Sequence, residues 1–280
     1  MKFSLVLGTL GRTEELVRFL NHLVGQTYRD FELIVVDQND DDRLVPIVAQ
    51  YRDKLDIEHM RCERGLSRSR NAGLTRIRGN IVAFPDDDCW YPPDLLEKVA
   101  SIFATSPDID GITGRFTDGE GRSEGRWLSH SMPLTRYNVW RGAISFSIFL
   151  RRRVVQSTGK FNELLGVGAG TAWGASEETD YLLRSMHLGF KLHYFYDLVL
   201  HHPVKSLSFD ASACARQEKY EAGIGRVMRL NHYPFWYFPL TCLRTCAGVG
   251  VALIKGRFPQ ARFKSVSIRA RITGWRGKPG

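Results

Sequence analysis

The sequence predicts an α/β protein with a mostly parallel, doubly wound sheet, and two observations carry that prediction. Three short apolar runs are rich in β-branched residues and end in polar residues or glycine, as strands covered on both faces do: residues 3–7, 31–36 and 80–84. Segments with helical spacing of apolar residues alternate with them, at residues 13–26, 43–51 and 67–76. This alternation favours right-handed crossovers and a sheet with helices on both faces.

The second half of the chain is less regular. We expect a strand over 144–150, a helix over 151–158, a helix over 177–188 and a strand over 190–200. A glycine-rich loop, residues 164–171, precedes the helix that begins at 177. A chain of 280 residues with 43% hydrophobic and 25% charged residues is long enough for one large domain and an appendage. We therefore expect one α/β domain over 1–204 and a helical region over 205–280.

The net charge of +9 is unevenly distributed along the chain. Residues 205–280 contain 14 Lys or Arg and 3 Asp or Glu, which gives +11 and leaves −2 for the rest. Within this region the apolar run 235–254 contains Pro239 and Arg244, which argue against a helix that spans a membrane. We expect a helix in the membrane interface, with peripheral contact over 235–264; the alternative is that the run packs on the protein itself or on a partner subunit.

The composition and the sequence pattern disfavour a disulfide framework, a thiolate zinc site and nucleic acid as a partner. The five cysteines are an odd number and form no CxxC pair, which argues against a disulfide framework and against a thiolate zinc site, and favours a reducing cytoplasm. The opening segment has a short apolar run and no small-residue cleavage site, so we interpret it as a first strand. Nucleic acid is not an expected partner, because the basic residues are interleaved with an apolar run instead of a base-stacking platform.

Polar residues gather where the predicted strands end. Thr9 and Arg12 follow the first strand, Asp37 follows the second, and the triplet 86–88, all Asp, follows the third. Ligands of open α/β sheets bind beyond the carboxyl ends of the strands, so these side chains are candidates for one site. Three adjacent carboxylates repel one another unless a cation lies among them, and oxygen ligands suit Mg²⁺ or Mn²⁺. The alternative is a solvated acidic turn.

Five segments of the chain resemble the inverting glycosyltransferases of family two, which have the GT-A fold. They are SLVLGTLGR, ELIVVDQND, GLSRSRNAGL, FPDDDCWYPPDLLE and GASEETDYLLR, in that order, over about residues 3–202. The resemblance implies a Rossmann-like catalytic domain over 1–204, with a nucleotide-sugar half at about 1–100 and an acceptor half at about 101–204. It also implies transfer of a sugar from a nucleoside diphosphate donor, with the UDP type favoured, to an acceptor hydroxyl with inversion of configuration.

The resemblance assigns the donor and metal sites to the strand-end residues. Asp37 would accept a hydrogen bond from the ring N–H of a uracil-like base, and otherwise it is a plain turn residue. Arg70 would meet the base or the phosphates, and otherwise it is a surface charge. The implied donor-binding residues are Thr9, Arg12, Asp37, Arg70, Asp86 and Asp87. The implied ligands of Mg²⁺ or Mn²⁺ are Asp88, Asp87 and His202, and for the histidine a structural role is the alternative.

The later motif supplies the implied general base and the acceptor site. By resemblance Glu178 is the base, with Glu177 as the fallback, because the family usually has Asp at this position; helix capping is the alternative for both. Gly170 permits close backbone approach and Trp173 offers an apolar face to a sugar ring, so both are candidates for acceptor binding.

The expected partners follow from this assignment. They are a nucleotide-sugar donor and a glycan or lipid-linked glycan acceptor, in a bacterial surface-polysaccharide pathway at the cytoplasmic face of the membrane. The competing interpretation is a catalytically silent protein that binds nucleotide sugars or glycans at the membrane.

Overall fold

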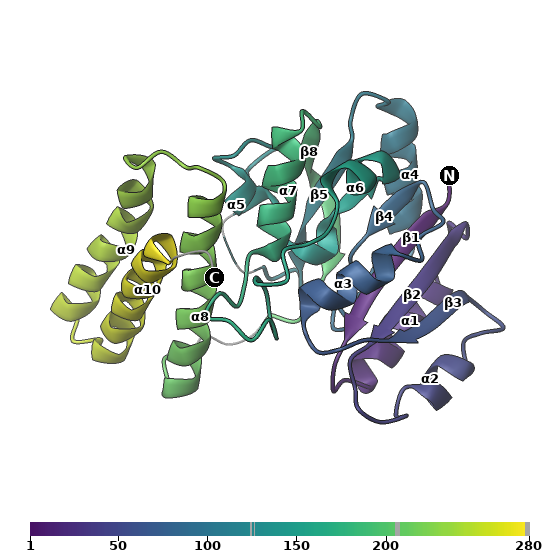
Figure 1. The fold of residues 1–280 in the computed structure, drawn as a ribbon, viewed down its shortest axis with the longest axis horizontal. Helices are drawn as coiled ribbons and strands as arrows, with labels where there is room; N and C mark the ends of the chain where they lie inside the picture. Colours follow the sequence, from purple (N-terminus) through teal and green to yellow (C-terminus); the bar gives the residue numbers. More distant parts are fainter. Residues whose placement is uncertain (124, 126, 205–207, 278–280) are drawn as a thin grey trace. The chain divides into compact units, whose positions relative to one another are not determined.

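The chain forms two compact units in the computed structural model, which describes residues 1–123, 125, 127–204 and 208–277 (Figure 1). The first unit comprises Met1–Phe161 and Tyr181–Val204, and the second comprises Asn162–Asp180 and Lys205–Gly280. The segment 162–180 is thus counted with the C-terminal helices. Residues 205–207, where the predicted appendage begins, lie outside the described residues. The assignment of a catalytic domain to 1–204 and of its two halves stays a prediction.

Within the described residues the first unit contains an eight-stranded, mostly parallel sheet of order β3-β2-β1-β4-β7-β5-β8-β6. The strands are β1 Phe3–Thr9, β2 Phe31–Asp37, β3 Asp56–Arg61, β4 Ile81–Ala83, β5 Gly111–Thr117, β6 Met132–Pro133, β7 Phe149–Arg151 and β8 Leu192–His201. The first four pair in parallel, and β8 is parallel to β5. Strand β7 lies antiparallel between β4 and β5, and β6 is antiparallel to β8. The predicted fold class is confirmed.

The helices of the first 161 residues include those that the sequence predicts. They are α1 Glu14–Val24, α2 Val45–Ala49, α3 Leu66–Leu74, α4 Leu95–Thr105, α5 Val139–Gly142 and α6 Arg152–Thr158, with a 3₁₀ turn η1 at Ser145–Ser147. Helix α7, Glu177–His187, begins in the second unit and ends in the first. The helices of 13–26, 43–51, 67–76, 151–158 and 177–188 are thereby confirmed, with shorter ends.

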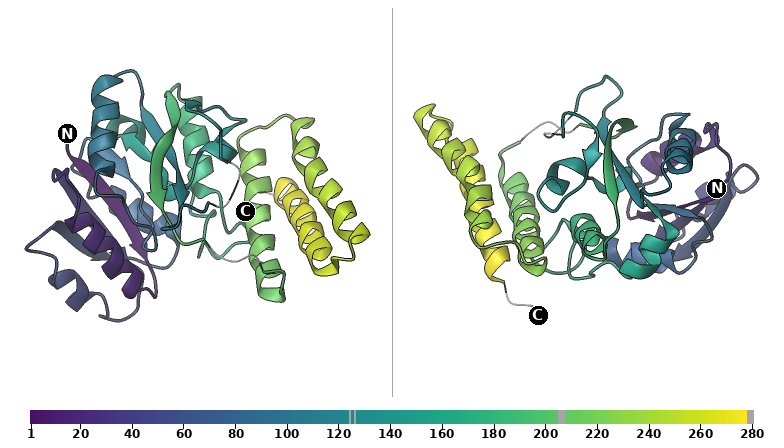
Figure 2. Two further views of the ribbon diagram at one scale, coloured as in Figure 1. Left: turned by 180° about the vertical axis from the view of Figure 1, so that it is seen from behind. Right: turned by 90° about the horizontal axis from the view of Figure 1, so that it is seen from above.

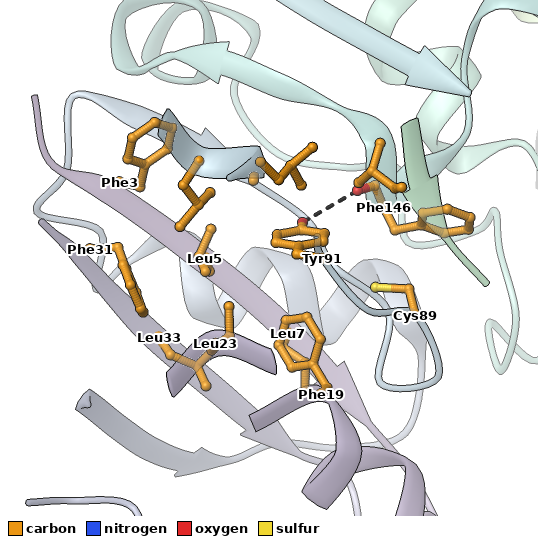
Figure 3. Packing of buried hydrophobic residues seen from close by; sticks show 14 of the residues in the cluster. Phe3, Leu5, Leu7, Phe19, Leu23, Phe31, Leu33, Cys89, Tyr91 and Phe146 are labelled. Atoms are coloured by element: carbon orange, nitrogen blue, oxygen red, sulfur yellow. Dashed lines mark hydrogen bonds between the residues drawn. The ribbon is translucent and has the colours of Figure 1, made fainter. Parts of the chain in front are cut away.

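The apolar face of α1 explains why the sheet forms where it does. Alternate side chains of β1, Phe3, Leu5 and Leu7, are fully buried with Phe19 and Leu23 of α1 (Figure 3). Helices α1 and α4 cover this face, while α3 packs against β1 and β2 from the other side. Because both faces are covered, the central strands contain continuous apolar runs, such as residues 33–36 of β2, and these runs are the signal that the sequence carries.

The predicted strand 144–150 is wrong over most of its length. Only Phe149–Arg151 of this segment pairs as a strand, and Ser145–Ser147 forms a 3₁₀ turn. The Oγ atom of Ser147 donates to the carbonyl oxygen of Ile144 at 2.9 Å, so the serine stabilises a local turn in place of strand pairing. The pattern of apolar residues alone gave no sign of this.

The second unit contains three long helices within its described residues (Figure 2). They are α8 Ala211–Leu230, α9 Tyr237–Ile254 and α10 Phe258–Arg276. Helix α10 packs against both α8 and α9. A Cβ atom at Gly274 would lie 1.9 Å from the carbonyl oxygen of Ala222, so α8 and α10 approach to backbone contact at this glycine.

A buried ion pair connects the three helices. The Nε atom of Arg271 donates to Oε2 of Glu221 at 2.7 Å, and Gln217 donates to the other carboxylate oxygen at 3.1 Å. Arg271 also donates to the carbonyl oxygen of Thr241 in α9 at 2.9 Å. Burial raises the pKa of Glu221, and Arg271 opposes that rise. One guanidinium thus links side chains or backbone of α8 and α9 to α10.

Candidate active site

Three parallel strands end side by side and bring the predicted polar residues to one edge of the sheet. Thr9 at the end of β1 is in register with Asp37 at the end of β2, and Gly8 forms a bridge with Asp86 beyond β4. The acidic triplet therefore lies at the carboxyl ends of the central strands, where α/β proteins bind their ligands.

Asp87 is buried and has a partner on each oxygen. Its Oδ2 atom accepts a hydrogen bond from the hydroxyl of Thr9 at 2.7 Å, and its Oδ1 atom accepts one from the guanidinium of Arg12 at 2.6 Å. Burial raises the pKa of Asp87 to about 6; Arg12 and Thr9 oppose the rise, while the charges of Asp88 and Asp86 add to it. The carboxyl of Asp87 is therefore costly to ionise in this site.

Asp88 is the more acidic neighbour. The same guanidinium of Arg12 lies 2.5 Å from its Oδ2 atom, and Nε2 of His202 lies 3.2 Å from its Oδ1 atom. Burial raises the pKa of Asp88, but His202 and Arg12 outweigh it and hold the pKa at about 2. Arg12, from the loop after β1, thus supplies positive charge to both Asp87 and Asp88.

The imidazole of His202 is fixed by its surroundings. Its ring stacks on Phe146 with 5.1 Å between the centroids and packs edge-on against Phe116. Its Nδ1 atom lies 2.8 Å from the carbonyl oxygen of Pro203, an atom that can only accept, so Nδ1 carries a proton. The Nε2 atom then faces the carboxylate of Asp88 while Nδ1–H is held by a backbone carbonyl, which is the arrangement of a metal-ligating histidine.

Asp86 and Arg70 form the third part of the cluster. Arg70, on α3, is buried and donates to Oδ1 of Asp86 at 3.3 Å, while its guanidinium lies over the ring of Phe161. Ser145, in the 3₁₀ turn, donates to Oδ2 of Asp86 at 3.0 Å. The serine was not among the predicted site residues, because its segment was interpreted as a strand. Arg70 is a buried partner of the acidic triplet, and not a surface charge.

Asp37 is enclosed by two residues that the sequence analysis did not single out. Its Oδ1 atom accepts hydrogen bonds from the backbone and side-chain nitrogens of Asn39 at 2.8 and 2.7 Å. The Nε2 atom of His59 lies 3.1 Å from its Oδ2 atom. The motif DQND contains the aspartate–asparagine turn that could have indicated Asn39. His59 comes from β3, whose polar sequence gives no comparable signal.

Glu177 and Glu178 belong to the second unit, at the first turn of α7. Glu177 is 4% exposed, and a Cβ atom at Gly166 would lie 2.9 Å from its carboxylate, so the loop packs tightly on it. Glu178 is half-buried and lies closer to solvent. Ser176, directly before them, has φ of 71°, a left-handed conformation that is uncommon for serine. Such strain persists where the surrounding structure enforces it, often at functional sites.

Gly170 lies in the glycine-rich loop and Trp173 lies just after it, both in the second unit. The guanidinium of Arg226 in α8 lies 4.5 Å from the centre of the Trp173 ring, so one aromatic face already holds a cation. Gly170 has φ of 78°, and no atom lies within 4 Å of the Cβ position, so the backbone is open to a ligand there. A sugar ring has access to at most the other face of Trp173.

A cysteine nucleophile is excluded at the acidic cluster. Cys89 follows the triplet, is fully buried, and lies with its Sγ atom 3.0 Å from the carbonyl oxygen of Asp86. Burial, with the nearby carboxylates, raises the pKa of Cys89 well above its usual range, so the thiolate is disfavoured.

The family model of Glycosyl transferase family 2 matches residues 4–161, more than half of the chain. The chain belongs to glycosyl transferase family 2. Glycosyltransferase AglE of Haloferax volcanii is 26% identical over 97% of this chain and 91% of its own length. The poly(ribitol-phosphate) beta-N-acetylglucosaminyltransferase TarS of Staphylococcus aureus is 31% identical over 36% of this chain and 19% of its own length.

Solved structures of such enzymes share the fold. A structure of S. aureus TarS 1–349 in complex with UDP-GlcNAc matches with a TM-score of 0.57 at 16% identity, over 98% of this chain and 91% of that one. The mannosyltransferase PcManGT of Pyrobaculum calidifontis, in complex with GDP-Man and Mn²⁺, matches with a TM-score of 0.63 at 16% identity, over 99% and 88%. The GT-A fold of this family 2 glycosyltransferase is thereby confirmed.

The side chains of the acidic cluster supply only some of the ligands that a divalent cation needs. Among the described residues no group of three or more His, Cys, Asp or Glu is placed to hold a metal. Asp88 and His202 nevertheless offer one carboxylate oxygen and one imidazole nitrogen 3.2 Å apart. Mg²⁺ and Mn²⁺ commonly complete such partial sets with substrate phosphate oxygens and water. Both oxygens of Asp87 are engaged by Thr9 and Arg12, so the pair Asp88 and His202 fits a cation better than the predicted trio does.

Proposed function

We propose that this family 2 glycosyltransferase is an inverting, divalent-metal-dependent enzyme that transfers a sugar from a nucleoside diphosphate donor to an acceptor hydroxyl. The observation that supports this best is the meeting of Asp88 and His202 beside Asp86 and Asp87 at the ends of the central strands. Asp87 has a pKa of about 6 and Asp88 a pKa of about 2, so two adjacent carboxyl groups differ strongly in acidity, as is common at functional sites.

We assign the donor to this edge of the sheet. Asp37, with Asn39 and His59 around it, is the proposed base-binding residue. A carboxylate accepts the ring N–H of uracil, a donor that cytosine lacks, and the family resemblance favours the UDP type. Arg12 is one-third exposed. Its guanidinium can bind a diphosphate when the metal ion takes its place beside Asp88. TarS and PcManGT were solved with UDP-GlcNAc and GDP-Man, which supports a nucleotide-sugar donor here.

Asp88 and His202 are the proposed metal-binding residues for Mg²⁺ or Mn²⁺. When bound, such a cation neutralises the negative charge that develops on the departing diphosphate. Neighbouring side chains hold His202 and Asp86 in position. Phe146 and Phe116 hold the imidazole of His202 in one orientation, and Arg70 with Ser145 holds Asp86.

Glu178 is the proposed general base. It takes the proton of the acceptor hydroxyl while the acceptor oxygen attacks the anomeric carbon from the face opposite the diphosphate, so configuration inverts in one displacement. Its half-buried position leaves it reachable by an acceptor, whereas Glu177 is enclosed by the loop at Gly166. No covalent intermediate is needed, and Gly170 and Trp173 stay the proposed acceptor contacts.

The proposed acceptor is a glycan or a lipid-linked glycan, and the proposed location is the cytoplasmic face of a membrane. The acceptor class is supported by the name of TarS, which transfers N-acetylglucosamine to poly(ribitol-phosphate). A bacterial surface-polysaccharide pathway is the corresponding context.

A donor screen tests the proposal. The full chain is incubated with UDP-, GDP- and dTDP-linked sugars, with Mn²⁺, with Mg²⁺ or with EDTA, and nucleoside diphosphate release is measured. We expect release with one nucleotide class, only when a divalent cation is present. Tight donor binding by calorimetry without release for any donor and any acceptor hydroxyl would instead support the catalytically silent interpretation.

A further inference from the structure

Helix α9, Tyr237–Ile254, is apolar on two opposite sides. It is 18 residues long with a mean hydropathy of 1.5, and only 17% of it is buried in the structure. Its buried residues are Phe238, Cys242 and Ala252. The exposed stripe, as we name it, consists of Leu240, Leu243, Ala247, Val251 and Ile254. At 100° per residue these five positions fall within an arc of about 80°, directly opposite the buried ones.

The exposed stripe consists largely of bulky side chains in water. Leu243 is 59% exposed and Ile254 is 88% exposed, while Leu240 and Val251 are each about half exposed. A contiguous apolar surface of this kind marks a contact with a protein or a membrane, since scattered apolar residues are normal but a continuous stripe is not. Helix α9 is therefore shaped to bury a second face.

Aromatic residues and basic residues flank the stripe along the sequence. Phe235 and Trp236 before α9, and Phe258 after it, are 83%, 53% and 66% exposed. Residues 235–277 include eight Lys or Arg and no Asp or Glu. The exposed members of this basic set are Arg244, Lys255, Arg257, Arg262, Arg269 and Arg276. Aromatic rings and basic side chains beside an apolar face are the features that recognise the headgroup zone of an anionic bilayer.

We propose that the exposed stripe of α9 docks into the surface of an anionic lipid bilayer with the helix axis parallel to the membrane plane. The side chains of Arg244, Lys255 and Arg257 then contact lipid phosphates, and the buried face of α9 stays on α10. This membrane contact supplies the proposed location of the glycosyl transfer, but it is tested independently of catalysis.

An orientation in the plane fits α9 better than a span does. Eighteen residues give a helix of about 27 Å, shorter than a hydrocarbon core of about 30 Å. Arg244 lies near the middle of α9 and would be at the centre of a bilayer that α9 spans, whereas at the surface its guanidinium reaches the headgroups. Arg271 of α10 donates to the carbonyl oxygen of Thr241, which ties the other face of α9 to its own protein.

Vesicle flotation of the full chain is the first test. We compare phosphatidylcholine vesicles with vesicles that contain phosphatidylglycerol, at low and at high salt. We expect binding that requires the anionic lipid and falls as salt rises. The double variant Leu243→Ser with Ile254→Ser should bind about tenfold or more weakly, with unchanged circular dichroism, because both side chains are exposed in the folded protein. The matched control is Val45→Ser with Leu188→Ser, two residues that are 47% and 56% exposed in the first unit and should leave binding unchanged.

The orientation has its own measurement. A fluorescent label is placed singly at positions 243, 247, 251 and 254, in a background with Cys246→Ser and Cys62→Ser, and quenched by lipids brominated at different acyl depths. One common shallow depth at all four positions supports docking in the plane. A depth that changes steadily from 243 to 254 overturns it in favour of a span.

Two other outcomes contradict the proposal. If the unaltered chain does not float with anionic vesicles at low salt, the membrane is not the partner. If sedimentation instead shows a dimer that the Leu243→Ser, Ile254→Ser variant loses, the stripe is covered by a second copy of the chain. Nucleoside diphosphate release in solution is measured on the same variants. Loss of lipid binding with release intact concerns only the stripe, whereas absence of release in a chain that binds vesicles concerns only the proposed function.

Discussion

The Nε2 atom of His202 lies 3.2 Å from the Oδ1 atom of Asp88, although the two residues are 114 positions apart in the sequence (202 − 88). His202 follows β8 and Asp88 follows β4, so their contact joins the last segment of the first unit to the loop after β4. Because the Nδ1–H group donates to the carbonyl oxygen of Pro203, Nε2 is the nitrogen that faces the carboxylate of Asp88.

The first prediction concerns that pair. Asp88→Asn or His202→Ala removes one of two proposed cation ligands, so we expect nucleoside diphosphate release to fall by about 10²-fold or more. EDTA should abolish release by the unaltered protein, and Mn²⁺ or Mg²⁺ should restore it. Mn²⁺ added with a nucleoside diphosphate should raise the melting temperature of the unaltered protein and not that of Asp88→Asn.

Asp53→Asn is the matched control for the first prediction, because Asp53 is an exposed aspartate outside the cluster. It should keep both the release and the shift in melting temperature. Full activity in excess EDTA would show that Asp88 and His202 serve another purpose.

The second prediction concerns Arg12, whose guanidinium contacts Asp87 and Asp88 together. Arg12→Gln leaves two buried carboxylates without their shared cation, and we expect a loss of about 2 kcal/mol in the free energy of unfolding without metal. Mn²⁺ should recover more of that stability in the variant than it adds to the unaltered protein. Urea denaturation with and without Mn²⁺ measures both quantities. Equal effects of Mn²⁺ on the two proteins would contradict the idea that Arg12 takes the role of a cation in this cluster.

The third prediction is a pH dependence set by Asp87. Its pKa is about 6 in the folded protein and near 4 when unfolded, so between these values the folded state binds the extra proton. Stability from this group is therefore greatest at low pH and falls as pH rises from 4 to beyond 6, by about 3 kcal/mol in total. Asp88, with a folded pKa of about 2, has the opposite sign, since its contribution is lost only as the pH falls below 4.

A comparison with Asp87→Asn isolates that effect. Free energies of unfolding of the metal-free proteins are measured at pH 4 and pH 8. The stability of the unaltered protein relative to the variant should fall between these two values. A difference that is constant, or that grows with pH, would show that Asp87 ionises easily in the folded protein.

The central strands of the sheet could be predicted because strands that are buried on both faces have runs of apolar residues, which are visible in the sequence. Every residue of Phe31–Asp37 is buried, and five of its seven residues are apolar. Strand β3, Asp56–Arg61, lies at the sheet edge with its side chains exposed or half-buried, so its sequence is polar and it was not predicted. The strand Gly111–Thr117 was missed for a different reason, because two of its seven residues are glycines, which are poor strand formers.

The site could be predicted as a set of residues but not as a set of contacts. Strand ends place Thr9, Asp37 and the acidic triplet at one edge by topology alone. The position of Arg12 between Asp87 and Asp88 depends on a loop conformation and a side-chain rotamer, neither of which leaves a periodic pattern in the sequence. Likewise, Ser145 reaches Asp86 only because residues 145–147 form a turn in place of the expected strand.

The last prediction concerns the proposed general base. Glu178→Gln keeps the size and the hydrogen-bonding capacity of the side chain but removes its ability to accept a proton, so transfer to an acceptor should fall by roughly 10²- to 10⁴-fold. Donor binding, measured by calorimetry, should be unchanged, because the donor residues are elsewhere in the chain. Glu177→Gln should lower transfer less, and Glu218→Gln, a change at an exposed residue of α8, should leave it unaltered. Hydrolysis of the donor is measured separately, since water can replace the acceptor hydroxyl as the nucleophile. If Glu177→Gln abolishes transfer while Glu178→Gln keeps it, with both proteins folded, then Glu177, whose carboxylate packs against Gly166, is the base. The assignment to Glu178 is then wrong.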